Sequence, residues 1–229
     1  MDLFNRSVKV SDSGLLQNRT DWHCHILPGV DDGVETMEES LSILKAYEEA
    51  GIREVWFTPH IMEDIPNRTA ALRQQFTNLQ VAYKGRLRLH LAAENMMDGL
   101  FEERLEARDL LPIGDGRLLV ETSYFNPPCD LKGILRRVQS AGFFPLLAHP
   151  ERYMYMEERQ YSELKTMGVE FQLNLTSLTG AYGPEAKAKA EYLLRNGMYN
   201  FSGTDLHRAE SLQHFLDSKI KKKLLGLVP

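Results

Sequence analysis

The sequence predicts an α/β protein built on a parallel sheet, and three features of the chain support this prediction. Apolar segments rich in β-branched and aromatic residues alternate with amphipathic helical segments along most of the 229 residues. The apolar segments are short, as in parallel sheets whose faces are covered by helices. No repeat, low-complexity tract or linker-like stretch divides the chain. An open doubly wound sheet and a closed or distorted β/α barrel both fit this pattern.

Seven short apolar segments are predicted to be strands. In chain order they span residues 19–25, 54–58, 86–93, 117–121, 143–148, 169–175 and 198–202. The second segment, EVWFT, contains β-branched and aromatic residues and ends at Pro59, and the fifth follows a helix stop at Gly142.

Seven helices are predicted between or after these strands. They span residues 35–50, 69–83, 100–107, 131–141, 157–167, 184 up to Gly197, and 210–225. The first carries apolar residues at helical spacing before Gly51 ends it, and Gly168 ends the fifth in the same way. We expect residues 1–18 to be an irregular leader and residues 19–229 to form a single domain.

The composition narrows the class of protein. Hydrophobic residues make up 43% of the chain and charged residues 26%, as in ordinary globular proteins, so intrinsic disorder is not expected. No apolar run approaches the roughly 18 residues of a membrane-spanning helix, and no secretory signal is visible. The net charge of −5 argues against a nucleic-acid partner. Two cysteines cannot form a disulfide framework, so a cytoplasmic location is expected.

Polar residues gather at, or shortly after, the ends of the predicted strands. Five of the seven histidines and four carboxylates share this placement: His23, His25, His60, His149, His207, Asp32, Glu94, Glu121 and Asp205. The C-terminal ends of parallel strands lie at one edge of a sheet or barrel, so we expect these side chains to converge. Taken alone, the Asp-Asp-Gly sequence that contains Asp32 favours a turn or a helix cap.

A converging set of imidazoles and carboxylates predicts a metal site. Without cations these groups would repel one another or lose hydration, whereas imidazole and carboxylate are common ligands of divalent metals. Nine ligands are too many for one ion and enough for two or three. Three divalent cations would exceed the four carboxylates in charge by about two, which suits a phosphate dianion attacked by a metal-activated water.

Arg152 is the candidate for contacting phosphate, because it follows the strand-end His149 closely and a guanidinium offers parallel donors to phosphoryl oxygens. The alternative is a surface ion pair with Glu151 or Glu157.

The full set of motifs resembles the polymerase and histidinol phosphatase (PHP) superfamily. The motifs are His-x-His with a downstream Asp-Asp-Gly, Thr-Pro-His, Glu94, Glu121, His-Pro-Glu-Arg and Asp-x-His. Within that superfamily, the stretch HCHILPGVDDG is similar to the bacterial capsular-polysaccharide tyrosine phosphatases of the CpsB/CapC/YwqE type. The likeness covers roughly residues 19–215. One departure is Cys24, where those enzymes often carry Ser or Thr.

This resemblance implies a distorted seven-stranded β/α barrel that hydrolyses phosphotyrosine with two or three divalent ions, most often manganese, with iron or zinc as alternatives. It implies a phosphotyrosine protein substrate, a bacterial tyrosine kinase of polysaccharide export, and a role in capsule or exopolysaccharide synthesis. It also implies how the nine residues divide among the ions: His23, His25, Glu94 and Asp205 for one, Glu94, Glu121 and His149 for a second, and Asp32, His60 and His207 for a third. Arg152 matches the family's phosphate-binding arginine, and a second arginine has no firm match, Arg208 being only a neighbour of the motif.

Other functions remain open or are excluded by the sequence. Cysteine-dependent tyrosine phosphatases use Cys-x5-Arg, but Val30 and Leu135 stand six residues after the two cysteines, so that class is excluded. Histidinol-phosphate phosphatase is the alternative activity, followed by a phosphodiesterase or exonuclease and by a metal-binding module without turnover. The sequence leaves the metal, the physiological substrate and the oligomeric state undecided.

Overall fold

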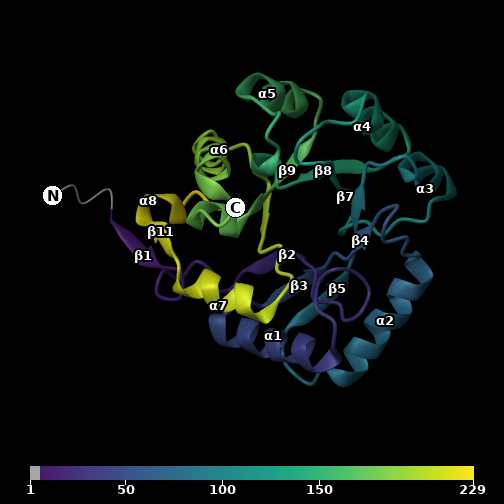
Figure 1. Ribbon diagram of the computed structural model, residues 1–229. Helices are drawn as coiled ribbons and strands as arrows, with labels where there is room; N and C mark the ends of the chain where they lie inside the picture. Colours follow the sequence, from purple (N-terminus) through teal and green to yellow (C-terminus); the bar gives the residue numbers. More distant parts are fainter. Residues whose placement is uncertain (1–5) are drawn as a thin grey trace.

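The computed structural model describes residues 6–229 as a mixed α/β fold (Figure 1). Its strands are β1 (Ser7–Lys9), β2 (Thr20–Cys24), β3 (Glu54–Phe57), β4 (His60–Ile61), β5 (Arg88–Leu91), β6 (Glu94–Met96), β7 (Arg117–Glu121), β8 (Phe144–Ala148), β9 (Glu170–Asn174), β10 (Phe201–Gly203) and β11 (Lys219–Lys221). Its helices are α1 (Met37–Ala50), α2 (Thr69–Ala82), α3 (Phe101–Ala107), α4 (Leu131–Ser140), α5 (Glu158–Thr166), α6 (Gly183–Arg195), α7 (Ala209–Asp217) and α8 (Lys222–Leu225), with 3-10 turns η2 (Pro150–Arg152) and η3 (Leu175–Thr179).

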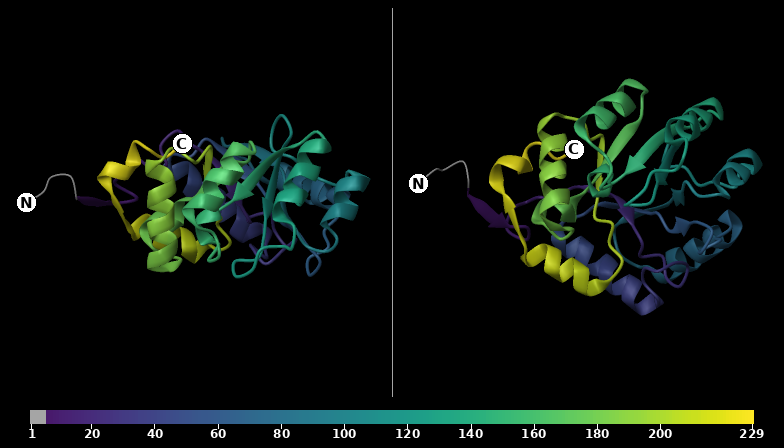
Figure 2. Two further views of the ribbon diagram at one scale, coloured as in Figure 1. Left: turned by 90° about the horizontal axis from the view of Figure 1, so that it is seen from above. Right: turned by 45° about the horizontal axis from the view of Figure 1, so that its top comes forward.

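Parallel strands form the centre of the fold, as the alternating pattern predicts. Six strands pair in the order β10-β9-β8-β7-β6-β4, and three more pair in the order β2-β3-β5. The two sheets meet where β2 lies beside β10, because the amide of Asp205 donates to His23 O at 2.7 Å and the amide of His25 donates to Leu206 O at 2.8 Å. The strands therefore curl around a common centre, and the helices lie on the outside (Figures 1 and 2). The open doubly wound alternative is wrong for this reason.

The helices begin and end where local chemistry satisfies their free backbone groups. Thr36 caps α1 by accepting from the amide of Glu39 at 3.2 Å, and Gly51 ends it in the left-handed region at φ 98°. In α5, Glu157 and Gln160 form a reciprocal capping box. These signals explain why the predicted helix boundaries lie within a few residues of the observed ones for α1 and α5.

The strands carry apolar side chains on both faces. Leu118 and Val120 of β7 belong to the large core under the helices, whereas Leu119 belongs to a small cluster on the other face. Successive side chains of a strand point to opposite faces, so one short apolar run supplies both cores. Among residues 6–229, no helix has the length and apolar character needed to cross a bilayer.

The predictions for the two ends of the chain were wrong in part. Residues 1–5 lie outside the described residues, but Ser7–Lys9 forms a strand inside the predicted irregular leader and pairs antiparallel with Lys219–Lys221. The predicted helix 210–225 is divided, because Ser218 is extended at ψ 167° and Ile220 alternates with exposed or half-buried lysines as in a strand. This contact with a distant segment is invisible to local periodicity.

The third predicted strand, residues 86–93, also differs from the structure. It is shorter, Arg88–Leu91, and pairs with β3, while Glu94 begins the separate strand β6 in the larger sheet. Between β5 and β6 the amide of Ala93 donates to Leu111 O at 3.0 Å, so this residue does not pair with a neighbouring strand. Glu94 and His60 therefore lie at breaks between two strand segments rather than at a strand terminus.

Gly203 is expected to be essential for bringing β10 against β2. A Cβ at this position would lie 2.5 Å from His23 Cβ and 2.7 Å from its backbone nitrogen. We expect Gly203→Ala to lower the free energy of unfolding by about 1–3 kcal/mol in urea titrations, the usual cost of overpacking. Gly226→Ala is the matched control, since nothing lies within 4 Å of a Cβ there. Equal stability of the two variants would contradict this account of the strand contact.

Candidate metal centre

A buried carboxylate, Glu94, lies at the centre of the predicted site. Four imidazole nitrogens surround its two oxygens: His23 Nε2 at 3.2 Å, His25 Nε2 at 3.3 Å and His60 Nδ1 at 3.2 Å from Oε2, and His149 Nε2 at 3.0 Å from Oε1. The side chain is 1% exposed. Three strand segments, β2, β4 and β8, thus place four histidines around one carboxylate.

The other predicted site residues lie in contact with this cluster. Glu121 Oε1 is 3.0 Å from His60 Nδ1, and Asp205 Oδ1 is 3.4 Å from Nε2 of both His23 and His25. His207 is stacked on His25 with ring centres 4.1 Å apart. Asp32, whose side chain is 61% exposed, reaches the outer edge, 3.6 Å from His60 Nε2.

Three groups of these residues have ligand atoms within 4.8 Å of one another. The groups are His23, His25, Glu94 and Asp205; His25, Asp32, His60 and His207; and His60, Glu94 and Glu121. The first group is the set that the family resemblance implies. The other two differ from it, because His60 lies closer to Glu121 than His149 does, at 3.0 Å against 4.0 Å, and because His25 joins the outer group.

Strained backbone accompanies two of the site residues. His149 after β8 and Asp205 after β10 have positive φ angles of 31° and 53°, a region that non-glycine residues rarely adopt. Each such residue costs on the order of 1–3 kcal/mol and persists where its surroundings enforce it. For His149 the turn is continued by η2, whose amide at Arg152 donates back to His149 O at 2.9 Å. The turn brings Arg152 to the same side as the histidine.

Hydrogen bonds behind the histidines decide which nitrogen faces the centre. His25 Nδ1 lies 2.9 Å from Asp31 Oδ2, and His23 Nδ1 lies 3.0 Å from Gln172 Oε1. Each Nδ1 therefore donates its hydrogen outward, as metal-binding histidines do, and each Nε2 lone pair points inward. Sequence reasoning missed Asp31 and Gln172 in this role, although the Asp-Asp pair was a signal for the former.

The donor set fits divalent cations. The Nε2 atoms of His23 and His25 face each other at 3.0 Å, and neutral imidazoles protonated on Nδ1 would place two lone pairs together. Glu94 Oε2 and Glu121 Oε1 are buried without a hydrogen-bond partner, although imidazole nitrogens lie close to both. A cation shared by these atoms removes the repulsion and satisfies the oxygens.

The electrostatics of the protein alone point the same way. Burial opposes the charge on His23, but Glu94 and Asp205 outweigh it and raise its pKa to about 9. Burial also opposes ionisation of Glu94, yet the surrounding histidines hold the pKa of its carboxyl well below the usual range. Burial and the nearby His25 lower the pKa of His207 to about 4, so this imidazole is neutral at pH 7. The buried carboxylates at the centre therefore require positive charge beside them, whereas His207 at the edge of the cluster provides none.

Arg152 lies against the same centre and is not a surface residue. Its Nη1 donates to Asp205 Oδ2 at 2.5 Å, and its side chain is 15% exposed. Pairing with Glu151 or Glu157 is wrong, because Glu151 is buried and accepts hydrogen bonds from the amide of Asn174 and from Ser177 and Tyr199. Burial opposes the charge, but Asp205 outweighs it and raises the pKa of Arg152, so the guanidinium stays protonated.

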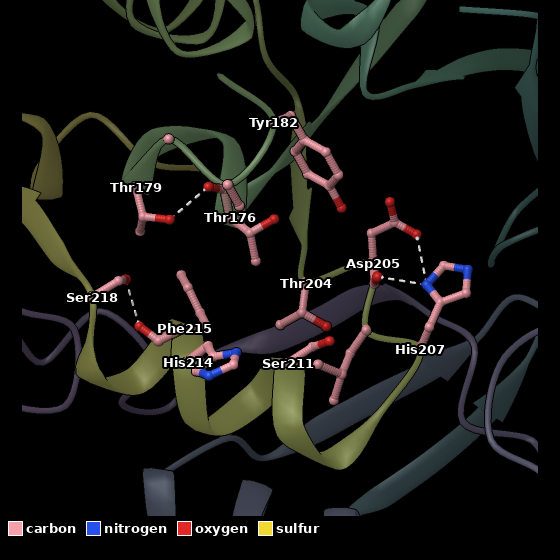
Figure 3. Close-up of a pocket in the computed structure, with 13 residues that line it drawn as sticks. Thr176, Thr179, Tyr182, Thr204, Asp205, His207, Ser211, His214, Phe215 and Ser218 are labelled. Atoms are coloured by element: carbon pink, nitrogen blue, oxygen red, sulfur yellow. Dashed lines mark hydrogen bonds and ion pairs between the residues drawn. The ribbon is translucent and has the colours of Figure 1, made fainter. Parts of the chain in front are cut away.

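A cavity of about 630 Å³ opens beside the centre (Figure 3). Asp205 and His207 form its inner end, Tyr182 forms one side, and Ser211 and Phe215 of α7 form another. This cavity gives access to the carboxylate and imidazole cluster.

Two further residues near the site have structural roles. Cys24 is buried, and its thiol lies 3.4 Å from Trp56 O, so it points away from the two histidines that flank it. Asn67 donates to Val30 O and His60 O at 2.8 Å and 2.9 Å, which ties the loop before α2 to the site.

The fold and this cluster define a class: an α/β protein whose parallel strands converge on a buried site with the ligand chemistry of a metal centre. Within that class, residues 19–222 match the family model described as capsular polysaccharide synthesis, CpsB/CapC. The chain belongs to this family, which confirms the resemblance seen in the motifs.

Named relatives and a solved structure agree with this membership. The tyrosine-protein phosphatase YwqE of Bacillus subtilis is 30% identical over 198 residues, covering 83% of this chain and 78% of the relative. The tyrosine-protein phosphatase CpsB of Streptococcus agalactiae is 27% identical, covering 88% of each. The crystal structures of YwqE and of CpsB from Streptococcus pneumoniae, described as unique metal-dependent tyrosine phosphatases, include a chain with a TM-score of 0.77 and 28% identity over 84% of this chain and 81% of that one.

Metal-free protein is expected to lose stability as the pH rises from 6.5 to 9. The pKa of His23 is about 9 in the folded state and 6.5 when unperturbed, so its stabilising charge is fully present below the lower value and lost through the higher one. Urea unfolding of chelator-treated protein across this range checks the decrease. His23→Asn should reduce it and His214→Asn should leave it unchanged, whereas stability that rises with pH would contradict it.

Proposed function

We propose that this protein is a metal-dependent protein-tyrosine phosphatase that acts in capsule or exopolysaccharide synthesis. The observation that carries the proposal is the buried cluster of four histidines and three carboxylates, with His207 at its edge and a protonated arginine, Arg152, against one of those carboxylates, Asp205. Membership of the CpsB/CapC family and the names of its relatives support phosphotyrosine as the substrate. The proposed substrate protein is a bacterial tyrosine kinase of polysaccharide export, and the proposed location is the cytoplasm.

The proposed ligands are the nine residues that the sequence singled out. His23, His25, Glu94 and Asp205 would hold one ion, and the remaining residues would hold one or two more: Asp32, His60, Glu121, His149 and His207. Divalent cations at such a site, manganese first and iron or zinc as alternatives, supply positive charge and lower the pKa of water toward neutrality. We also propose that the fold is a distorted seven-stranded barrel, in which β3 with β4 and β5 with β6 each count as one interrupted strand.

The residues of the chain itself would bind the phosphate and orient the ligands. Arg152 carries a charge next to Asp205, and its other N–H donors match phosphoryl oxygens. Asp205 is held on Oδ2 by Arg152 and Asn174, so Oδ1 remains directed at His23 and His25. His207 donates from Nδ1 to the carbonyl of Asp205 at 2.9 Å, which leaves its Nε2 as a neutral acceptor 3.7 Å from Asp32 Oδ1, among the outer group of ligands.

The activity is tested by metal content and substrate choice together. We expect purified protein to carry two or three metal equivalents and to hydrolyse a phosphotyrosine peptide faster than a phosphoserine peptide or histidinol phosphate. His60→Ala should reduce turnover severely, and Cys24→Ser and Cys129→Ser should keep it, because no thiolate nucleophile is used. Less than one metal equivalent per chain after reconstitution with manganese would overturn the proposed metal centre. Faster hydrolysis of histidinol phosphate than of the phosphotyrosine peptide would overturn the proposed substrate in favour of the alternative.

Arg152 is expected to act on the phosphate rather than on the metals. Arg152→Ala should keep its metal content and lose on the order of 10²-fold or more in kcat/KM, about 3 kcal/mol of transition-state stabilisation. Arg152→Lys should recover little, because an ammonium cannot supply two parallel donors. Arg159→Ala, at an arginine that is 86% exposed on α5, is the control and should have normal kinetics. Normal kcat/KM in Arg152→Ala would leave catalysis to the metals alone.

A further inference from the structure

The guanidinium of Arg152 lies between two tyrosine rings. Its Cζ is 4.3 Å from the ring centre of Tyr124 and 4.0 Å from that of Tyr182. Both distances are within the roughly 6 Å over which a cation is attracted to an aromatic face. Tyr124 follows β7 and Tyr182 precedes α6, so two separate loops meet at this one side chain.

Hydrogen bonds through Asn174 connect Tyr182 to the ion pair between Arg152 and Asp205. Asn174 Nδ2 lies 3.2 Å from the hydroxyl of Tyr182 and 2.9 Å from Asp205 Oδ2, which also accepts from Arg152 Nη1. The N–H groups of a guanidinium lie in its plane and bind to oxygen atoms, so the ring contacts do not use up these donors. In the described part of the chain, the hydrogen bond to Asp205 uses Nη1 and leaves the other side-chain donors for a bound group.

The position of Tyr182 argues against a role in core packing alone. The residue is 39% exposed and lines both the cavity of about 630 Å³ next to Asp205 and a second cavity of about 240 Å³ next to Arg152. Figure 3 shows its ring standing beside Asp205 at the side of the larger cavity. The ring therefore contacts Arg152 at the entrance to the site.

We propose that Tyr124 and Tyr182 are positioning residues that fix the plane of Arg152 for the phosphoryl group. The inference rests on the proposed phosphatase function and adds residues that the motifs do not contain. A long arginine side chain loses rotamer freedom when it binds a ligand. Holding it between two rings before the substrate arrives reduces that loss and keeps its donors aligned.

A double-mutant cycle tests the proposal with manganese-loaded protein and a phosphotyrosine peptide. In the wild-type background, Tyr182→Leu should lower kcat/KM at least about tenfold, whereas Tyr182→Phe, which keeps the ring, should stay within about threefold. In the Arg152→Ala background, Tyr182→Leu should change kcat/KM less than about twofold, because the group it positions is gone. Tyr124→Leu should follow the same pattern, because its ring also contacts the guanidinium.

Metal content and a tyrosine that does not contact Arg152 provide the controls. Each variant should keep the wild-type metal content, and Tyr192→Leu, at a half-buried tyrosine of α6, should have normal kinetics. Equal losses for Tyr182→Leu with and without Arg152 would show a structural role and overturn the positioning. Equal losses for Tyr182→Phe and Tyr182→Leu would do the same. Wild-type protein that is inactive on phosphotyrosine would instead remove the proposed function, and the positioning role with it.

Discussion

The burial of Glu94 among four histidines is the constraint on which the rest of the site depends. A carboxylate that is 1% exposed loses its hydration, a cost of several kcal/mol that only paired charge and close polar contacts can offset. His23, His25, His60 and His149 provide those contacts within 3.0–3.3 Å. Because these histidines come from three separate strand segments, β2, β4 and β8, the sheet must curl until these segments meet around one point.

The convergence of the strands forces a strained backbone conformation at Asp205, and neighbouring hydrogen bonds stabilise it. Asp205 adopts a positive φ of 53°, but its amide donates to His23 O at 2.7 Å and its carboxylate is held by Asn174 and Arg152. Strain of this kind persists where several bonds over-determine the conformation. Two residues before Asp205 the chain has a glycine, Gly203, because no side chain fits there between β10 and β2. Stability and site geometry are therefore coupled at this junction.

Glu151 and Arg152 are neighbours in the His-Pro-Glu-Arg motif, but their side chains make contacts in different places. The 3-10 turn η2 directs Glu151 into the interior, where it anchors the start of η3 through the amide of Asn174 and the hydroxyl of Ser177. The same turn directs Arg152 to the centre, where it pairs with Asp205. Asn174 then links these two places by donating to Asp205. Arg152, the proposed phosphate-binding residue, is thus linked directly to Asp205, a proposed metal ligand.

Local patterns were enough to predict the alternating α/β class and to select the chemistry-bearing residues, because periodicity, caps and polar residues beside apolar strands are properties of short segments. Tertiary structure decided the curl that excludes an open sheet, the separation of Glu94 from the preceding strand, and the pairing of Ser7–Lys9 with Lys219–Lys221. It also decided that Arg152 meets Asp205 and two tyrosines rather than Glu151. These contacts join segments up to about two hundred residues apart, and their energies depend on burial and distance, which a single segment does not encode.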